Sequence, residues 1–180
     1  NYLVTSAADV APAIREAFAV AKPGRPGPVL VDITKDAQQG LADLDWEGAE
    51  PHLMEAQDEA LPGDGDRREA LALIHAAKRP LILAGHGITL SSAEREIIAL
   101  AEKAQIPIAV TLLGIGGVPA SHPLNMGMMG MHGEAWVNEA IQEADLLLAL
   151  GMRFDDRVTG NLKTYALNAR KIHVDIDRAE

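Results

Sequence analysis

Four short segments most constrain the fold of this chain: PLILAG (80–85), IPIAVT (106–111), DLLLALG (145–151) and KIHVDID (171–177). Their apolar residues are largely consecutive, which is typical of strands covered by helices on both faces. Helical patterns lie between them, at about 66–78, from Ser91 or Ser92 to Ala104, at 133–143 and at 161–169. Strands that alternate with helices predict an α/β fold with a doubly wound, mostly parallel sheet. Right-handed crossovers leave few topologies for it.

Residues 1–35 form a smaller piece ahead of this alternation. Val10, Ile14 and Phe18 recur every four residues, as on one stripe of an amphipathic helix, and PVLVDI (28–33) is a predicted strand. One helix and one strand cannot bury their own apolar surface. We therefore expect residues 1–35 to be the end of a domain that lies mostly outside this chain.

An acidic segment, 36–66, separates that piece from a third part, 67–180. Of the 26 acids in the chain ten lie here with no Lys or Arg, which leaves 16 elsewhere to balance the 16 bases. Four glycines and two prolines interrupt any period, so the segment is a predicted linker with at most a short helical turn near 46–49 or 53–60. The net charge of −10 argues against nucleic acid as a partner.

Several classes of protein are excluded by simple counts. There is no cysteine, so disulfides and thiolate chemistry are absent. No apolar run approaches the roughly 20 residues that span a bilayer, and NYLVTSAADV has no signal-peptide pattern. The six histidines are scattered without metal-ligand spacing. We expect a cytoplasmic protein, no membrane partner, no metal site in these residues, and a fragment of a longer chain because the initiator Met is missing.

Unusual residues gather where the predicted strands end, the edge at which open parallel sheets bind ligands. Each group also has a plain structural interpretation. The glycines of GHG (85–87) can simply form a tight turn, and GIGG (114–117) lacks the full G-x-G-x-x-G pattern. NMGMMGMHG (125–133) suits a backbone lying against a flat ligand, or a flexible loop that fills gaps. His132 can equally cap or pack.

The last strand and the preceding loop carry charges. Asp175 and Asp177 can cap the strand end or accept ribose hydroxyls. GMRFDDRVTG (151–160) is either a solvated turn or a loop that holds something charged. Two arginines suit a diphosphate or a carboxylate by forked hydrogen bonds. We expect Arg153 and Arg157 to face a ligand and one of the two aspartates, by preference Asp156, to brace an arginine.

Three stretches carry a resemblance to a known family: GRPGPVLVDITKDAQQ (24–39), LGIGGVPASHPLNMGMMGMHG (113–133) and GMRFDDRVTGNL (151–162). In order and spacing they resemble the catalytic large subunit of acetolactate synthases, thiamine-diphosphate enzymes. The resemblance implies the end of a pyrimidine-binding domain in 1–35 and, in 67–180, a Rossmann-like central domain that binds FAD. It implies condensation of pyruvate with a second 2-oxo acid, in branched-chain amino-acid synthesis, by a homodimer or tetramer that can bind a small regulatory subunit.

The resemblance also implies which residues contact FAD, a cofactor without a redox task in this reaction. They are Gly85, His86, Gly87, Thr111, Leu112, Leu113, Met129, Gly130, Met131, His132, Gly151, Arg153, Asp155, Arg157, Val158, Asp175 and Ile176. No catalytic residue is expected in this fragment, because thiamine diphosphate and Mg²⁺ belong mostly to missing parts. Gly63-Asp64-Gly65 resembles the start of the thiamine motif, but the first Asn after it is Asn125, so we expect a linker turn there.

Departures from the family leave alternatives open. Many relatives carry GGG where this chain has Gly85-His86-Gly87, and many carry an arginine and a lysine in the linker, which has neither here. The alternatives are another thiamine-diphosphate enzyme, of glyoxylate carboligase or pyruvate oxidase type, a non-catalytic nucleotide-binding module, and a central domain that has lost FAD.

Overall fold

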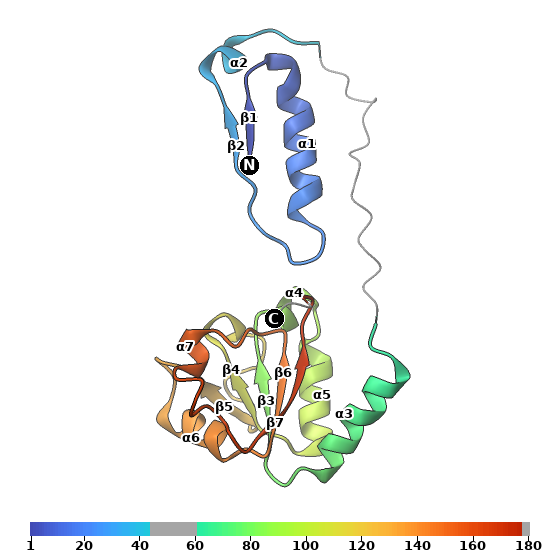
Figure 1. Cartoon of the computed structure of the whole chain (residues 1–180), viewed down its shortest axis with the longest axis vertical. Helices are drawn as coiled ribbons and strands as arrows, with labels where there is room; N and C mark the ends of the chain where they lie inside the picture. The colour runs from blue at the N-terminus through green and yellow to red at the C-terminus, as the bar shows by residue number, and fades with distance from the viewer. Residues whose placement is uncertain (44–60, 178–180) are drawn as a thin grey trace. The chain divides into compact units, whose positions relative to one another are not determined.

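The computed structural model of the chain describes residues 1–43 and 61–177. It divides into two compact units, Asn1–Leu61 and Pro62–Glu180, each built from its own strands and helices (Figure 1). The expected helical turns at 46–49 and 53–60 lie outside the described residues. No helix in the described part of the chain is long and apolar enough to cross a membrane.

The first unit is a two-stranded parallel sheet with one long helix. Strand β1 (Tyr2–Val4) pairs with β2 (Val31–Ile33), and α1 (Val10–Ala21) connects them after a 3₁₀ turn, η1 (Ala7–Asp9). Strand β1 was not predicted, because three residues give no periodic signal. A short helix, α2 (Lys35–Gln39), occupies the start of the segment that was expected to be a linker, with Ala37 buried.

Helix α1 does not bury the stripe that its sequence pattern indicated. The buried side chains are Ala13, Ala17 and Ala19, whereas Ile14 is 40% exposed and Phe18 62% exposed. The small sheet meets the helix on its alanine side, where short side chains permit close approach. The larger apolar side chains are left outside this unit.

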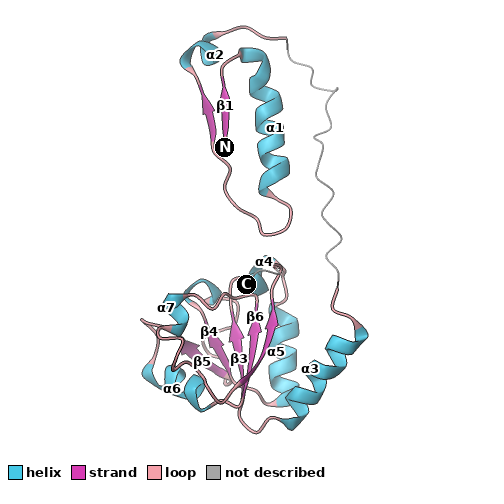
Figure 2. Ribbon diagram, viewed as in Figure 1, coloured by secondary structure: helices cyan, strands magenta, loops and turns pink. Residues whose placement is uncertain are grey.

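The second unit is a five-stranded sheet whose strands are all parallel, in the order β5-β4-β3-β6-β7. Helices lie on both sides of it (Figure 2). The elements in chain order are α3 (Asp64–Ala76), β3 (Pro80–Ala84), α4 (Gly87–Leu90), α5 (Glu94–Ala104), β4 (Ile108–Val110), η2 (Leu112–Gly114), β5 (Asn125–Met128), α6 (Ala135–Glu143), β6 (Leu146–Leu150), α7 (Asp156–Thr159) and β7 (Arg170–Val174).

The two faces of this sheet have separate cores. On β3, Leu81 and Leu83 belong to the core that includes Val137 and Ile141 of α6. Ile82 and Ala84 alternate with them and belong to the other core, with the helices α4 and α5. Because successive side chains of a strand point to opposite faces, a strand buried on both faces must be apolar throughout. The predicted doubly wound α/β fold is thus confirmed.

The helix predicted from Ser91 or Ser92 begins later than expected. Helix α5 begins at Glu94 after Ala93, which has no side-chain capping bond. The hydroxyl of Ser91 instead donates to the carbonyl of Gly87 at 2.8 Å, closing the short helix α4. The hydroxyl bonds back to a carbonyl four residues earlier, a local competitor of capping.

The region around 125–169 also differs from expectation. The Met-Gly stretch begins as a strand, β5, and the helix predicted at 161–169 is absent: these residues form turns, while α7 occupies 156–159. Ala166 has a φ of 41°, a left-handed conformation that interrupts a helix. Gly63-Asp64-Gly65 is not a linker turn either, because Asp64 begins α3 and the Gly63 N–H donates to the Asp66 carboxylate at 3.0 Å.

Candidate functional site

The order of the strands in the sheet reverses direction between β3 and β6, and we call this place at the carboxyl edge the reversal point. From β3 the chain goes to β4 and β5 on one side, and from β5 it crosses to β6 and β7 on the other. The loop 85–87 follows β3, and the loop 151–155 follows β6. Open α/β sheets bind ligands in the crevice at such a point. The helices α4 and α7 lie at this edge, where the strand arrows end in Figure 2.

The two loops at the reversal point pack backbone to backbone. The Gly87 N–H donates to the Gly151 carbonyl at 2.9 Å, and the Gly85 N–H donates to the Leu150 carbonyl at 3.0 Å. A Cβ on Gly85 would lie 2.1 Å from the Gly151 oxygen, and one on Gly87 would lie 2.5 Å from the Gly151 Cα. Packing within the chain therefore explains why Gly85, Gly87 and Gly151 have no side chain. We call the surface formed by their backbones the glycine floor.

His86 connects this floor to the loop after β4. Its side chain is exposed, and its Nδ1 lies 3.0 Å from the carbonyl oxygen of Leu113. Thr111 uses its hydroxyl oxygen to accept the Gly114 N–H at 3.1 Å. The side chains of Leu112 and Leu113 are 68% and 70% exposed, so this turn presents apolar surface at the edge.

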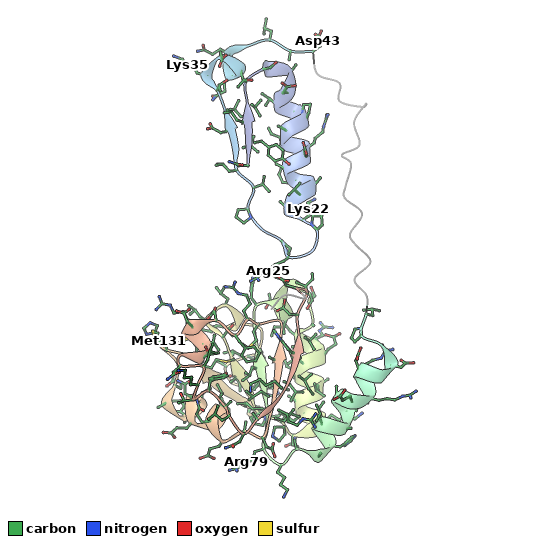
Figure 3. All side chains as sticks on the ribbon, viewed as in Figure 1. Lys22, Arg25, Lys35, Asp43, Arg79 and Met131 are labelled. Atoms are coloured by element: carbon green, nitrogen blue, oxygen red, sulfur yellow. The ribbon has the colours of Figure 1, made fainter. Side chains whose placement is uncertain are left out.

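The Met-Gly loop after β5 is held by an amide that sequence reasoning missed. The side chain of Asn138, on α6, accepts from the Gly130 N–H and donates to the Gly130 carbonyl, each at 2.9 Å. Gly130 has a φ of 98°, which favours glycine. Met129 is buried, whereas Met131 is 58% exposed and lies at the surface (Figure 3), as does His132.

Asp155 caps helix α7 and also lies beside an arginine. Its Oδ1 accepts from the backbone N–H of Arg157 at 3.0 Å and of Val158 at 3.1 Å. Its Oδ2 is 3.8 Å from Arg153 Nη2, and Asp156 Oδ2 is 4.0 Å from Arg157 Nε. Both aspartates thus lie beside an arginine, and Asp155 has the additional capping role.

Arg157 joins its loop to the Met-Gly loop. Its carbonyl accepts the Met131 N–H at 2.8 Å, and its Nη1 lies 3.6 Å from the Met131 sulfur. The Arg157 side chain is 72% exposed. A cavity of about 230 Å³ adjoins Met131 and is lined by Gly130, Met131, Asn138, Ile141, Gln142, Val158, Thr159, Gly160 and Tyr165. That volume is smaller than a typical site for a drug-sized ligand.

Two residues near the end of β7 were not predicted: His173 on the strand itself and Phe154 in the loop after β6. His173 Nε2 lies 2.8 Å from the Met152 carbonyl oxygen and 3.9 Å from Asp175 Oδ2. The Phe154 ring meets the His173 ring edge to face, with centroids 5.2 Å apart. A histidine between two apolar residues of a strand was the available signal. Asp175 is largely buried and its Oδ1 accepts the Asp177 N–H at 2.9 Å.

Two further observations concern polar groups. Burial raises the pKa of Tyr165 to about 12, and its hydroxyl has no hydrogen-bond partner among the described residues. Within residues 1–43 and 61–177, no group of three or more His, Asp or Glu side chains could hold a metal ion.

The amino-acid sequence of the chain is similar to known proteins of one family. Residues 67–180 match the family described as "Thiamine pyrophosphate enzyme, central domain". The whole chain is 43% identical to the acetolactate synthase isozyme 1 large subunit of Escherichia coli K12 and covers 31% of that protein. It is 44% identical to the chloroplastic acetolactate synthase of Arabidopsis thaliana, covering 27% of it. It is 45% identical to the acetolactate synthase large subunit of Mycobacterium tuberculosis, covering 29%.

The chain thus spans less than a third of the length of these relatives. The family match covers the five-stranded unit, including all the loops at its carboxyl edge. The chain belongs to the thiamine pyrophosphate (thiamine diphosphate) enzymes, and residues 67–180 are a central domain of that family.

Proposed function

We propose that this chain is part of the large subunit of an acetolactate synthase. The whole enzyme would join two pyruvates, or pyruvate and 2-oxobutyrate, to 2-acetolactate or 2-aceto-2-hydroxybutyrate with release of CO₂. The observation that carries the proposal is an identity of 43–45% over the full chain to three proteins with that name. Thiamine diphosphate with Mg²⁺ supplies the carbanion chemistry in such an enzyme.

The part of the function that this chain would supply is an FAD site at the carboxyl edge of the second unit. The types of side chain present fit a flavin dinucleotide. Arg153 and Arg157 can donate forked hydrogen bonds to phosphate oxygens, and Asp175 can accept from ribose hydroxyls. The exposed Leu112 and Leu113 side chains offer apolar cover for a ring. Because Gly85, Gly87 and Gly151 have no side chains, the backbone between these groups leaves space for a ligand.

The remaining residues of the expected FAD site would contribute mainly by shape. The backbones of Gly85, Gly87, Gly130 and Gly151 keep the edge open. Asp155 would act through helix α7, which it caps, more than through a ligand contact. The other candidates at this edge are His86, Thr111, Met129, Met131, His132, Val158 and Ile176.

The first unit would belong to the pyrimidine-binding domain, with 36–66 as the linker to the central domain. It leaves large apolar side chains outside, with Leu3 68%, Phe18 62% and Leu30 65% exposed. Such surface is suited to pack against the rest of that domain. We propose a cytoplasmic homodimer or tetramer that acts on 2-oxo acids. The words "large subunit" in the names of two relatives support a small regulatory subunit as a further partner.

FAD titration of the chain tests the site. We expect saturable binding that Arg153→Ala weakens roughly tenfold or more, the effect of losing a charge-assisted hydrogen bond. Arg79→Ala is the matched control, because Arg79 is 68% exposed and immediately precedes β3, at the other end of the sheet (Figure 3). Equal effects of the two substitutions would show that Arg153 does not face FAD.

A turnover assay tests the division of labour. The chain with pyruvate, thiamine diphosphate, Mg²⁺ and FAD should yield no acetolactate, because both thiamine half-sites would lie mostly in other parts of the enzyme. Formation of acetolactate by these residues alone would overturn that assignment. Substrate competition with glyoxylate in a full-length enzyme separates acetolactate synthase from a carboligase of the same family.

A further inference from the structure

We propose that His173 is a positioning residue of the FAD site: it fixes the loop that carries Arg153. The orientation of Arg153 toward FAD rests on the function proposed above, whereas the fixing of the loop does not. His173 lies on β7, one strand away from the loop, and was not among the residues that the sequence indicated.

The loop after β6 leaves the sheet at one defined bond. The Gly151 N–H donates to the Val174 carbonyl of β7 at 2.8 Å, in continuation of the parallel pairing in which Leu150 is opposite Val174. Beyond Gly151 the chain turns away toward α7. The next tie between this loop and β7 is the contact between His173 Nε2 and the Met152 carbonyl oxygen, at 2.8 Å. The residue that follows this carbonyl is Arg153.

The same imidazole also packs against the other neighbour of Arg153. The Phe154 ring lies edge to face on His173, with an interplanar angle of 77°, and on Tyr165 at 6.2 Å between centroids. Aromatic pairs in this geometry stabilise beyond the area they bury. Residues 152 and 154 are therefore both held by His173, one through its backbone carbonyl and one through its ring.

The geometry fixes which nitrogen carries a proton. A carbonyl oxygen only accepts, so His173 Nε2 must donate to Met152. The Asp175 carboxylate, 3.9 Å from the same nitrogen, favours a hydrogen at that position. The side chain of His173 is only 22% exposed, so water competes weakly for this bond. Arg153 can then project from a loop whose backbone is held on both sides.

Two substitutions separate the roles of the donor and the ring. His173→Gln places an amide Nε2 near the position of the imidazole Nε2 and keeps the donor. His173→Phe keeps a ring for Phe154 and loses the donor. His75→Phe is the control, because His75 is an exposed histidine on α3. We expect His173→Phe to raise hydrogen exchange at the Gly151 amide, whose bond to the Val174 carbonyl lies beside the lost contact, and to weaken FAD binding roughly fivefold to tenfold, as for one lost hydrogen bond.

The conservative variant distinguishes positioning from general stability. His173→Gln should bind FAD within about twofold of the parent chain, because it keeps the hydrogen bond to the Met152 carbonyl that His173→Phe loses. Equal weakening by both His173 variants would overturn the donor role, as would unchanged FAD binding and unchanged exchange in His173→Phe.

The unsubstituted chain gives a readout that needs neither folding of a variant nor bound FAD. The ¹⁵N spectrum of its imidazoles should show His173 protonated on Nε2, and a tautomer protonated only on Nδ1 would overturn the proposal. Unsubstituted chain that shows the Nε2 tautomer and slow exchange at the Gly151 amide but does not bind FAD would refute the FAD site and leave the loop positioning intact.

Discussion

Replacing Gly85 by alanine should destabilise the five-stranded unit strongly, although it adds only one methyl group. A Cβ at this position would lie 2.1 Å from the Gly151 carbonyl oxygen and 2.5 Å from Met152 Cβ. Ordinary contacts begin near 3.4 Å, so the facing loop would have to withdraw by more than 1 Å. Neither obstacle is the flexible end of a side chain.

The cost has two parts. Overpacking of a well-packed site costs about 1–3 kcal/mol. Withdrawal of the loop also stretches the bonds from Gly85 N–H to Leu150 O and from Gly87 N–H to Gly151 O, now 3.0 and 2.9 Å. Each such bond contributes about 0.5–1.5 kcal/mol. The free energy of unfolding should fall by about 2–6 kcal/mol, a large part of the roughly 5–15 kcal/mol of a typical domain.

Urea unfolding followed by the fluorescence of Trp136 measures this change. The other tryptophan, Trp46, is replaced by Phe so that the signal comes from α6 alone. Gly65→Ala is the matched control, because Gly65 is inside α3 and, apart from its chain neighbours and the backbone of its own helix, no atom of the described residues would lie within 4 Å of its Cβ. The control should be neutral or more stable by up to about 1 kcal/mol. If Gly85→Ala unfolds within about 0.5 kcal/mol of the parent, a shift too small for overpacking, the backbone contact between the loops is refuted.

Three further outcomes follow from single contacts. Backbone N–H groups of Lys78 and Arg79 donate to the Asp145 carboxylate and lower its pKa. The stability that Asp145 contributes is therefore complete above the usual carboxyl pKa of about 4, and it is lost as the pH falls through the lowered pKa. Asp145→Asn should therefore lower the urea midpoint at pH 7 and lose this difference in acid; a constant difference would contradict it. Tyr165→Phe should leave the melting temperature unchanged or raise it, because the buried hydroxyl has no described partner, and a fall of several degrees would reveal one. Asn138→Ala should lower the free energy of unfolding, measured with urea, by about 1–3 kcal/mol, because the N–H and the carbonyl of the buried Gly130 both lose their partner. An unchanged free energy of unfolding would mean that water replaces the amide.

The fold of the second unit could be predicted because its strands are buried on both faces. Leu81 to Ala84 alternate between two cores, so every position has to be apolar, and this makes the strand visible in the sequence. Strand β5 was missed because Asn125–Met128 contains a glycine and lies at the edge of the sheet, where neighbours demand less of the sequence. The helix predicted at 161–169 does not form. Leu162 and Leu167 are 69% and 71% exposed, so their apolar side chains do not indicate a buried helix face.

The candidate site was only partly predictable, for a related reason. Strand ends identify the edge where a ligand would bind, so the loops could be listed from the sequence. Contacts between loops depend on the strand order, which brings 85–87 and 151–155 side by side. Asn138 holds the Met-Gly loop from a helix, and His173 holds the loop 151–155 from a strand. In the sequence neither residue stands out from other polar residues on a helix or a strand. Such supporting side chains become recognisable only after the chain is folded.

Packing within the chain explains the residue type at some candidate positions and not at others. Gly85, Gly87 and Gly151 are required by one another, whether or not a ligand is present. Internal packing gives no such reason for leaving Leu112 and Leu113 about 70% exposed on one short turn. Exposure alone does not indicate a ligand, because Leu162 and Leu167 are equally exposed and single exposed apolar side chains are common. Internal packing thus explains the glycine pattern that first draws attention to this edge, and it leaves the two leucines, side by side at a strand end, for ligand binding to explain.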